Sequence, residues 1–109
     1  LQEAHRQQQL LRVCKLVNSF PADEPVVLAG DFNDWRHRAH TVLREGAGLE
    51  EVFVNALGRA VRTFPANMPL LALDRIYVRN AAVHKPMQLP KKPWDKLSDH
   101  APLAAEILL

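Results

Sequence analysis

The sequence predicts an α/β fold, in which helices cover a β-sheet, and three observations support this prediction. Residues 1–19 carry apolar side chains at helical spacings between glutamines and arginines, which is typical of an amphipathic helix. Residues 26–29 are a short apolar run that ends in a turn signal at Gly30, which is typical of a fully buried strand. Residues 70–79 and 102–109 are further apolar segments that favour strands.

The remaining segments are predicted to alternate between short elements and loops. The two prolines in residues 20–25 end the first helix, and residues 38–45 favour a second helix that the glycines of residues 46–48 end. Residues 49–57 favour a short helical or irregular segment that ends at Gly58. The other expectations are a strand over residues 60–64, a loop over 65–69, a strand over 81–89 with Pro86 at an edge, and a polar loop over 91–96.

The composition limits the chain to one small globular domain. Its 109 residues, of which 48% are hydrophobic and 24% charged, suffice for one domain and not for two. A net charge of +2 is too weak to indicate nucleic acid or an anionic membrane as partner. No apolar run approaches the roughly 18 residues that span a bilayer, and no signal peptide is visible. The single cysteine, Cys14, is predicted to be a buried structural thiol in a reducing, cytoplasmic compartment.

Polar side chains interrupt or follow these apolar strands at three places. Asp31 and Asn33 follow the strand at residues 26–29, and because they are two residues apart they share one face of extended backbone. Asp74 lies inside an apolar segment, where a carboxylate costs free energy unless it is paired. Arg75 is an awkward partner, since adjacent strand residues point to opposite faces, so a histidine ring elsewhere is the better one.

The third place is Ser98-Asp99-His100, just before the last predicted strand. Each polar group has an ordinary interpretation by itself, because Gly, Asp and Asn are common in turns and loops are polar by default. If the three strands are neighbours in a sheet, however, carboxylates, an amide and an imidazole converge. Clustered carboxylates repel unless a cation joins them, and such oxygen ligands suit Mg²⁺ or Mn²⁺, which can polarise a phosphoryl oxygen.

A family resemblance covers residues 1–109. In this order, three motifs resemble the C-terminal half of the endonuclease/exonuclease/phosphatase superfamily, of bacterial type: Gly30-Asp31-Phe32-Asn33, Leu73-Asp74-Arg75-Ile76 and Ser98-Asp99-His100. The resemblance implies a single partial domain, half of a four-layer α/β sandwich in which two β-sheets pack inside helices. The family's first half, with an Asn, a histidine and the Glu that is its main metal ligand, is not found in this sequence. We therefore expect a fragment that lacks the N-terminal half and is inactive by itself.

The resemblance implies a metal-dependent phosphoesterase that hydrolyses phosphodiesters or phosphomonoesters. Asp31 would orient or deprotonate the attacking water, and Asn33 would hydrogen-bond the phosphate and hold Asp31. His100 would stabilise charge on a non-bridging oxygen, while Asp74 would fix the imidazole in its protonated form. Asp99 would lie at the divalent metal, Mg²⁺ or Mn²⁺, together with Asp31. Nucleic acid, a phospholipid head group and a small phosphodiester are all open as substrates.

Two other functions stay open from the sequence. The chain is alternatively a non-catalytic binding or assembly module that retains the half-fold, and its exposed sheet face would then drive homodimerisation. In a third interpretation, an unrelated hydrolase, Asp31, Asp99 and His100 are all direct metal ligands. Replacing Asp74 would distinguish the two enzyme interpretations. The reaction rate falls if the chain is a member of the superfamily and barely changes if it is an unrelated hydrolase. The metal affinity is unchanged in both cases.

Overall fold

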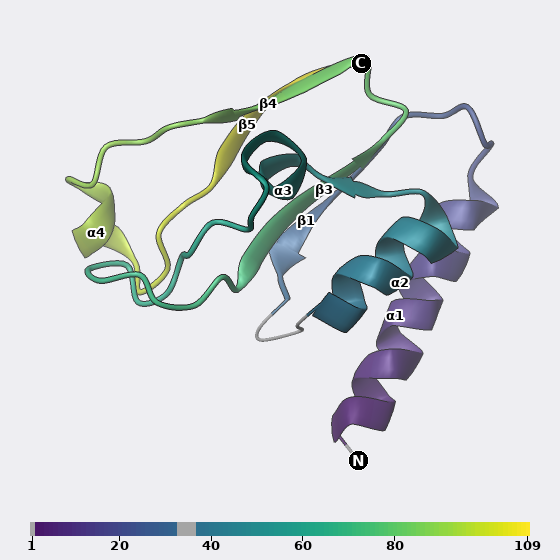
Figure 1. Cartoon of the computed structure of the whole chain (residues 1–109), viewed down its shortest axis with the longest axis horizontal. Coiled ribbons are helices and arrows are strands. Elements are labelled where there is room, and N and C mark those ends of the chain that lie inside the picture. The colour runs from purple at the N-terminus through teal and green to yellow at the C-terminus, as the bar shows by residue number, and fades with distance from the viewer. Residues whose placement is uncertain (1, 33–36) are drawn as a thin grey trace.

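The computed structural model describes residues 2–32 and 37–109, and its elements confirm the α/β fold (Figure 1). The elements, in chain order, are α1 (Gln2–Ser19), β1 (Val26–Asp31), α2 (His37–Ala47), β2 (Glu50–Glu51), α3 (Val52–Leu57), β3 (Asp74–Arg79), β4 (Val83–Met87), α4 (Trp94–Leu97) and β5 (Ala104–Leu108). Helix α4 lies at the side of the molecule opposite to α1 (Figure 1). Within the described ranges, no helix is both long and apolar enough to cross a membrane.

Three predicted elements differ from the structure. Residues 60–64 form no strand, because their pairing stops at an isolated bridge between Phe64 and Leu71, and Pro65 has no N–H group to continue it. Residues 70–73 lie outside β3, which begins only at Asp74. The predicted polar loop at residues 91–96 includes the first three residues of α4, since Pro93 is compatible with a helix start and the Asp95 N–H donates to the Lys91 carbonyl. The two-residue strand β2 was not predicted.

The strands form two antiparallel sheets, and the first of them sets the positions of the polar residues. Its strand order is β1-β3-β2, so β3 is central, while β4 and β5 form a separate two-stranded sheet. Because β3 runs opposite to β1, the end of β1 lies beside the start of β3, and Asp31 pairs with Asp74. Two sequence motifs more than 40 residues apart thus meet at one end of the sheet.

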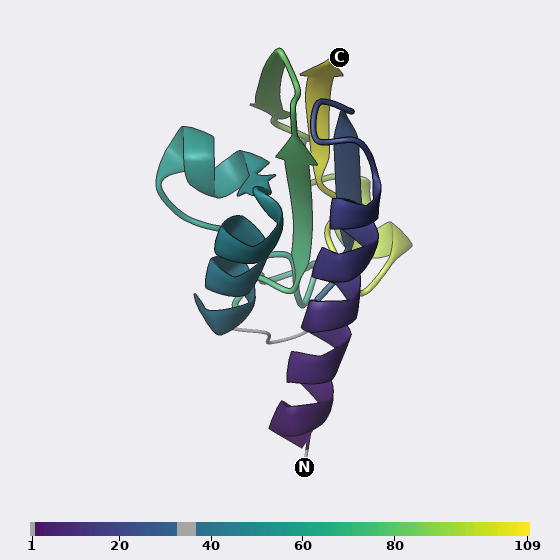
Figure 2. The same ribbon diagram turned by 90° about the vertical axis from the view of Figure 1, so that its right-hand side faces the viewer.

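Helices α1 and α2 cover one face of this sheet. They pack against each other and stand on the same side of β1 and β3 in Figures 1 and 2. Leu43 of α2 and Tyr77 of β3 are almost fully buried in the core that they share. Cys14 lies in the same core with 7% of its surface exposed, as predicted, and burial raises the pKa of its thiol. The apolar side of the amphipathic first helix therefore serves packing.

The prediction that the first strand is fully buried is wrong for this chain. Val26 and Leu28 pack against the α1–α2 core, but Val27 is 48% exposed and Gly30 and Asp31 are also exposed. The strand also continues through Gly30, where the sequence suggested a turn. The physical reason is that side chains alternate between faces, and the helices cover only one face of β1. The other face of β1 presents apolar side chains to solvent within the described residues.

A second core lies on the opposite face of β3. Val78 and Ile76 pack there with Val52 and Phe53 of α3, and with side chains of β5 such as Ile107. Helix α3 is well defined at both ends: the Glu51 carboxylate accepts a hydrogen bond from the Val54 N–H at 2.6 Å, and Gly58 ends the helix in the left-handed conformation with φ 78°. Residues 49–57 were predicted as a short helical or irregular segment that ends at Gly58, and the structure has the helical alternative over Val52–Leu57.

The conformation of Gly58 gives a stability prediction. Gly58→Ala should lower the free energy of unfolding by about 1 kcal/mol, because a side chain in the left-handed region costs roughly 1–2 kcal/mol. No atom lies within 4 Å of an added Cβ, so the cost comes from the backbone conformation alone. Gly58→Asn should lose less, because Asn tolerates this conformation. Urea unfolding measures the free energy of unfolding of both variants.

Gly30→Ala is the matched control. An added Cβ at Gly30 also meets no atom within 4 Å, but the residue is not in the left-handed region. Its free energy of unfolding should not fall. An equal loss in the two alanine variants would contradict the conformational explanation.

Candidate active site

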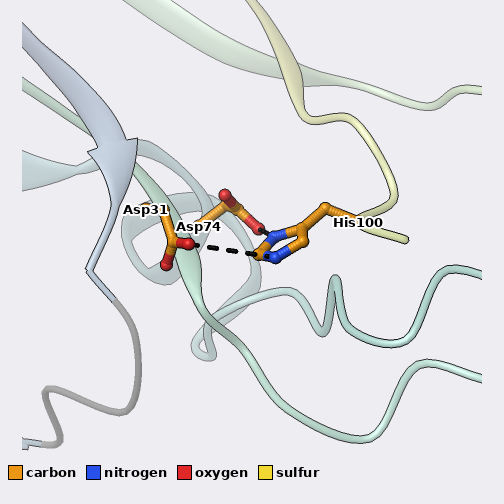
Figure 3. A group of neighbouring side chains, drawn as sticks. All are labelled: Asp31, Asp74 and His100. Carbon is orange, nitrogen blue, oxygen red and sulfur yellow. Dashed lines mark hydrogen bonds and ion pairs between the residues drawn. The ribbon is translucent and has the colours of Figure 1, made fainter. Parts of the chain in front are cut away.

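The site begins with the pairing of two carboxylates across the first sheet. Asp31 and Asp74 are directly opposite each other in the register of β1 and β3. Like charges in such cross-strand positions repel each other, so this arrangement is unfavourable unless a positive group joins them. The imidazole of His100 is that group, and Figure 3 shows it beside the two carboxylates. The structure therefore brings together three of the residues that the sequence singled out.

Backbone hydrogen bonds hold His100 in this position although it lies in a loop. The Ala101 N–H donates to the Thr63 carbonyl at 2.6 Å, and the Ala66 N–H donates to the Asp99 carbonyl at 2.7 Å. The ring of Phe64 packs beside the imidazole with 5.1 Å between the ring centroids. The segment before β3 thus holds the histidine loop on both sides of His100.

Asp74 is the partner that fixes the imidazole. Its Oδ2 atom lies 2.7 Å from His100 Nδ1 and accepts a second hydrogen bond, at 2.5 Å, from the hydroxyl of Thr63. The Asp74 N–H donates back to the same hydroxyl oxygen at 3.3 Å. Because Thr63 is fully buried and its hydroxyl is fixed, Asp74 can adopt only a narrow range of orientations. Nδ1 carries a proton in this arrangement, since a carboxylate oxygen accepts.

The second ring nitrogen of His100 faces Asp31. Nε2 lies 3.8 Å from Asp31 Oδ2, which is an ion-pair distance and longer than a hydrogen bond. The Asp31 side chain is 43% exposed, compared with 26% for His100 and 23% for Asp74. Asp31 is therefore the member of the group that solvent reaches most easily.

The carboxylates raise the pKa of His100. The largest cause is the hydrogen bond to Asp74. Desolvation, the next largest effect, lowers the pKa, and the negative charges of Asp74, Asp31 and Asp99 each raise it further. The charged imidazolium is thus favoured over a wider pH range than for a histidine in water. A protonated imidazole has two N–H donors and no lone pair for a metal ion.

The other predicted site residues are not part of this group of three. Asp99 is exposed; its side chain accepts from the Ser98 hydroxyl at 3.4 Å, and its charge acts on the nearby imidazole. Asn33 lies outside the described residues. Thr63 lies in the segment predicted as a strand over residues 60–64 and was not singled out as a site residue, although a polar side chain inside such a segment is a signal that could have indicated a role. Trp94 and Leu97 border a cavity together with Asp31, Asp74 and His100, and no such signal marked them in the sequence.

The side-chain oxygen and nitrogen atoms of the site are of the types that bind divalent cations. Asp31, Asp74 and His100 offer potential ligand atoms within 4.8 Å of one another, but Asp74 Oδ2 already accepts two hydrogen bonds and the imidazole favours its charged form. The carboxylates of Asp31 and Asp99 are exposed, and carboxylate oxygens are ligands that Mg²⁺ prefers. Mg²⁺ is usually bound through one or two carboxylates together with water and substrate phosphate, so two such carboxylates match the usual number of protein ligands.

Comparison with known proteins finds a matching family and two relatives. Residues 3–100 match the family model described as endonuclease/exonuclease/phosphatase family. The chain is 57% identical over all of its 109 residues to an uncharacterized protein, YbhP, of Escherichia coli K12, and equally to the YbhP protein of Shigella flexneri. It spans 43% of the length of these relatives. No solved structure matches the chain.

The fold defines the class, an α/β protein in which Asp31, Asp74 and His100 meet at one end of the first sheet. The family match covers most of the chain, so the chain belongs to the endonuclease/exonuclease/phosphatase family, whose members are generally hydrolytic enzymes. The resemblance that the three motifs carry is therefore confirmed at the level of the family.

The geometry predicts the titration of His100. Its pKa should lie above the ordinary value of 6.5 in the protein without divalent metal, and Asp74→Asn should lower it, because the principal hydrogen bond to the charged form is lost. The contribution of this pair to folding stability is then present below the unfolded pKa and is lost as the pH rises through the raised folded pKa. NMR titration of the imidazole resonances measures the shift. An unchanged pKa in Asp74→Asn would contradict the assignment, and His5→Ala should leave the His100 resonance unaffected.

Proposed function

We propose that this chain carries one part of the active site of a divalent-metal-dependent phosphoesterase, which hydrolyses a phosphodiester or phosphomonoester. The observation that supports the proposal most is that Asp74 binds one ring nitrogen of His100 at 2.7 Å, while the other ring nitrogen points to the more exposed Asp31. This arrangement presents a charged N–H donor and a carboxylate on the same open side. A phosphate ester and its attacking water need those two groups.

Each residue has a separate role in the proposed reaction. The Nε2–H group of His100 donates to a non-bridging phosphoryl oxygen and stabilises the negative charge that develops there. Asp74 is a positioning residue, which holds the ring and favours its protonated form. Asp31 orients the attacking water or accepts its proton while the water oxygen bonds to phosphorus. The bond between phosphorus and the ester oxygen breaks, and the departing oxygen takes a proton from solvent to leave as the alcohol. Asn33 is proposed to bind the phosphate and to hold Asp31, as the family resemblance implies.

Asp31 and Asp99 are the residues proposed to hold Mg²⁺ or Mn²⁺. When bound, such an ion polarises a phosphoryl oxygen and neutralises charge on it. Because the chain spans 43% of the length of its relatives, we propose that further ligands come from residues of the full-length protein outside residues 1–109. The substrate is proposed to be a nucleic acid, a phospholipid head group or a small phosphodiester.

The first prediction for this function concerns His100. In the full-length protein assayed with Mg²⁺ on bis(p-nitrophenyl) phosphate, His100→Ala should lower kcat/KM by about 10²–10³-fold, the usual loss when one donor to a developing oxyanion is removed. Asp74→Asn should lower kcat by a smaller factor with little change in metal affinity. His5→Ala, in an exposed position of α1, is the control and should keep full activity. Full activity in His100→Ala would refute the proposed role.

The second prediction concerns residues 1–109 by themselves. They should give no turnover above background with Mg²⁺ on the same substrate, because the proposed metal site is incomplete without the rest of the protein. Turnover by residues 1–109 that His100→Ala abolishes would contradict this. If the full-length protein is also inactive and residues 1–109 form a stable dimer, the alternative of a non-catalytic assembly module is favoured instead.

A further inference from the structure

We propose that the cavity beside Asp31 and His100 is a subsite for an apolar substituent of the phosphate-ester substrate, and that Trp94 and Leu97 of α4 recognise this substituent. The inference rests on the proposed function and narrows its substrate class. A phosphate ester with an aryl or alkyl group next to the phosphate would then be preferred over one with a polar alcohol such as glycerol.

The first observation is the size of the cavity. A single cavity of about 450 Å³ is bordered both by Asp31, Asp74 and His100 and by Trp94 and Leu97. A phosphate group is only a few times larger than a water molecule, which takes roughly 30 Å³ in the liquid. Phosphate bound at the imidazole therefore fills a minor part of the cavity, and the remainder can accept the group esterified to it.

The second observation is the chemistry of the walls. Asp31, Asp74 and His100, together with Arg75 and Ser98, are the polar residues of the lining. The remaining lining residues are apolar and include Ile76 and Leu103. A few polar groups that fix orientation, together with a predominantly apolar lining, are typical of sites for small organic ligands. Apolar walls favour an apolar substituent because burying it removes its surface from water.

The third observation is the exposure of α4. Trp94 is 37% exposed and Leu97 66% exposed, and neither belongs to the two core clusters of the described residues. Single exposed apolar residues are ordinary on protein surfaces, but these two share one cavity with the proposed catalytic group. They are three residues apart, so one turn of helix places them on neighbouring positions of the same face.

The short connection between α4 and His100 also limits how far the side chains of Trp94 and Leu97 can lie from the imidazole. Helix α4 ends at Leu97, and only Ser98 and Asp99 separate it from His100. The Asp99 carbonyl is hydrogen-bonded to the Ala66 N–H, and the His100 N–H donates to the Ser98 hydroxyl at 3.2 Å. A substituent on Leu97 and a phosphate on His100 thus contact two parts of one constrained segment.

Binding experiments test the subsite without relying on turnover. Isothermal titration calorimetry of the full-length protein compares phenyl phosphate, octyl phosphate, glycerol 2-phosphate and inorganic phosphate, in EDTA and again with Mg²⁺. Phenyl or octyl phosphate should bind about tenfold more tightly than glycerol 2-phosphate, as expected for partial burial of an apolar group. The phenyl and octyl arms distinguish an aryl substituent, such as a nucleobase or aromatic alcohol, from an aliphatic chain.

Matched variants assign the preference to α4. Leu97→Asn and Trp94→Ala should remove most of the tenfold preference for the apolar esters and leave the affinity for inorganic phosphate unchanged. Trp94→Phe should keep the preference for the apolar esters. Leu11→Gln is the control, because Leu11 is 61% exposed, similar to Leu97, and belongs to α1, which lies at the side of the molecule opposite to α4 (Figure 1). It should behave like the unaltered protein.

The outcomes separate this inference from the proposed function. Equal affinities for the apolar and polar esters, with phosphate still bound, would overturn the subsite and leave the phosphoesterase proposal standing. An apolar preference that survives in both Leu97→Asn and Trp94→Ala would also overturn it. If neither inorganic phosphate nor any ester binds in either condition, the proposed function fails and the subsite fails with it.

Discussion

The arrangement of the site depends on one unfavourable pairing, in which two carboxylates lie opposite each other on adjacent antiparallel strands. Asp31 ends β1 and Asp74 begins β3, so their repulsion is a direct result of the strand register. A positive charge between them relieves this repulsion, and His100 supplies it with Nδ1 at 2.7 Å from Asp74 and Nε2 at 3.8 Å from Asp31. The same contacts that make the register tolerable also raise the pKa of the imidazole.

Structural support for this charge group comes from buried and constrained neighbours. Thr63 is fully buried and hydrogen-bonds to Asp74, and its own carbonyl accepts from the Ala101 N–H next to His100. One residue therefore contacts both the carboxylate and the loop that carries the histidine. Thr63→Val would remove the hydroxyl while keeping the shape of the side chain, so its effect would be transmitted to the imidazole through Asp74.

The sheet that carries the site is covered unequally on its two faces. Helices α1 and α2 bury one face of β1, whereas Val27 on the other face is 48% exposed. The chain spans 43% of the length of its relatives, and the uncovered face is where further structure or a second copy of the chain would bury apolar surface. Homodimerisation through this face stays a prediction, as does the assignment of the chain to the C-terminal half of the sandwich.

The sequence by itself determined the helices and strands whose patterns are local. The amphipathic pattern of residues 1–19 and the apolar runs near residues 26 and 104 are properties of neighbouring residues, and they were sufficient for α1, β1 and β5. The glycine at position 58 indicated where α3 ends, while the segment before it stayed either helical or irregular. It also indicated Asp31, Asp74 and His100, because a charged group beside an apolar strand is costly without a partner. The family resemblance came from the same three motifs.

Only the tertiary structure decided which of these groups meet and how. The antiparallel register of β1 and β3 places Asp31 opposite Asp74, and no local pattern specifies which strands pair. The contact between Thr63 and Asp74 and the cavity shared by His100 and Leu97 likewise join residues brought together by folding. The sequence also did not predict that one face of β1 is exposed, because an apolar run has the same composition whether other elements cover one face of the strand or both. Burial depends on what packs against a strand, which is a property of the whole fold.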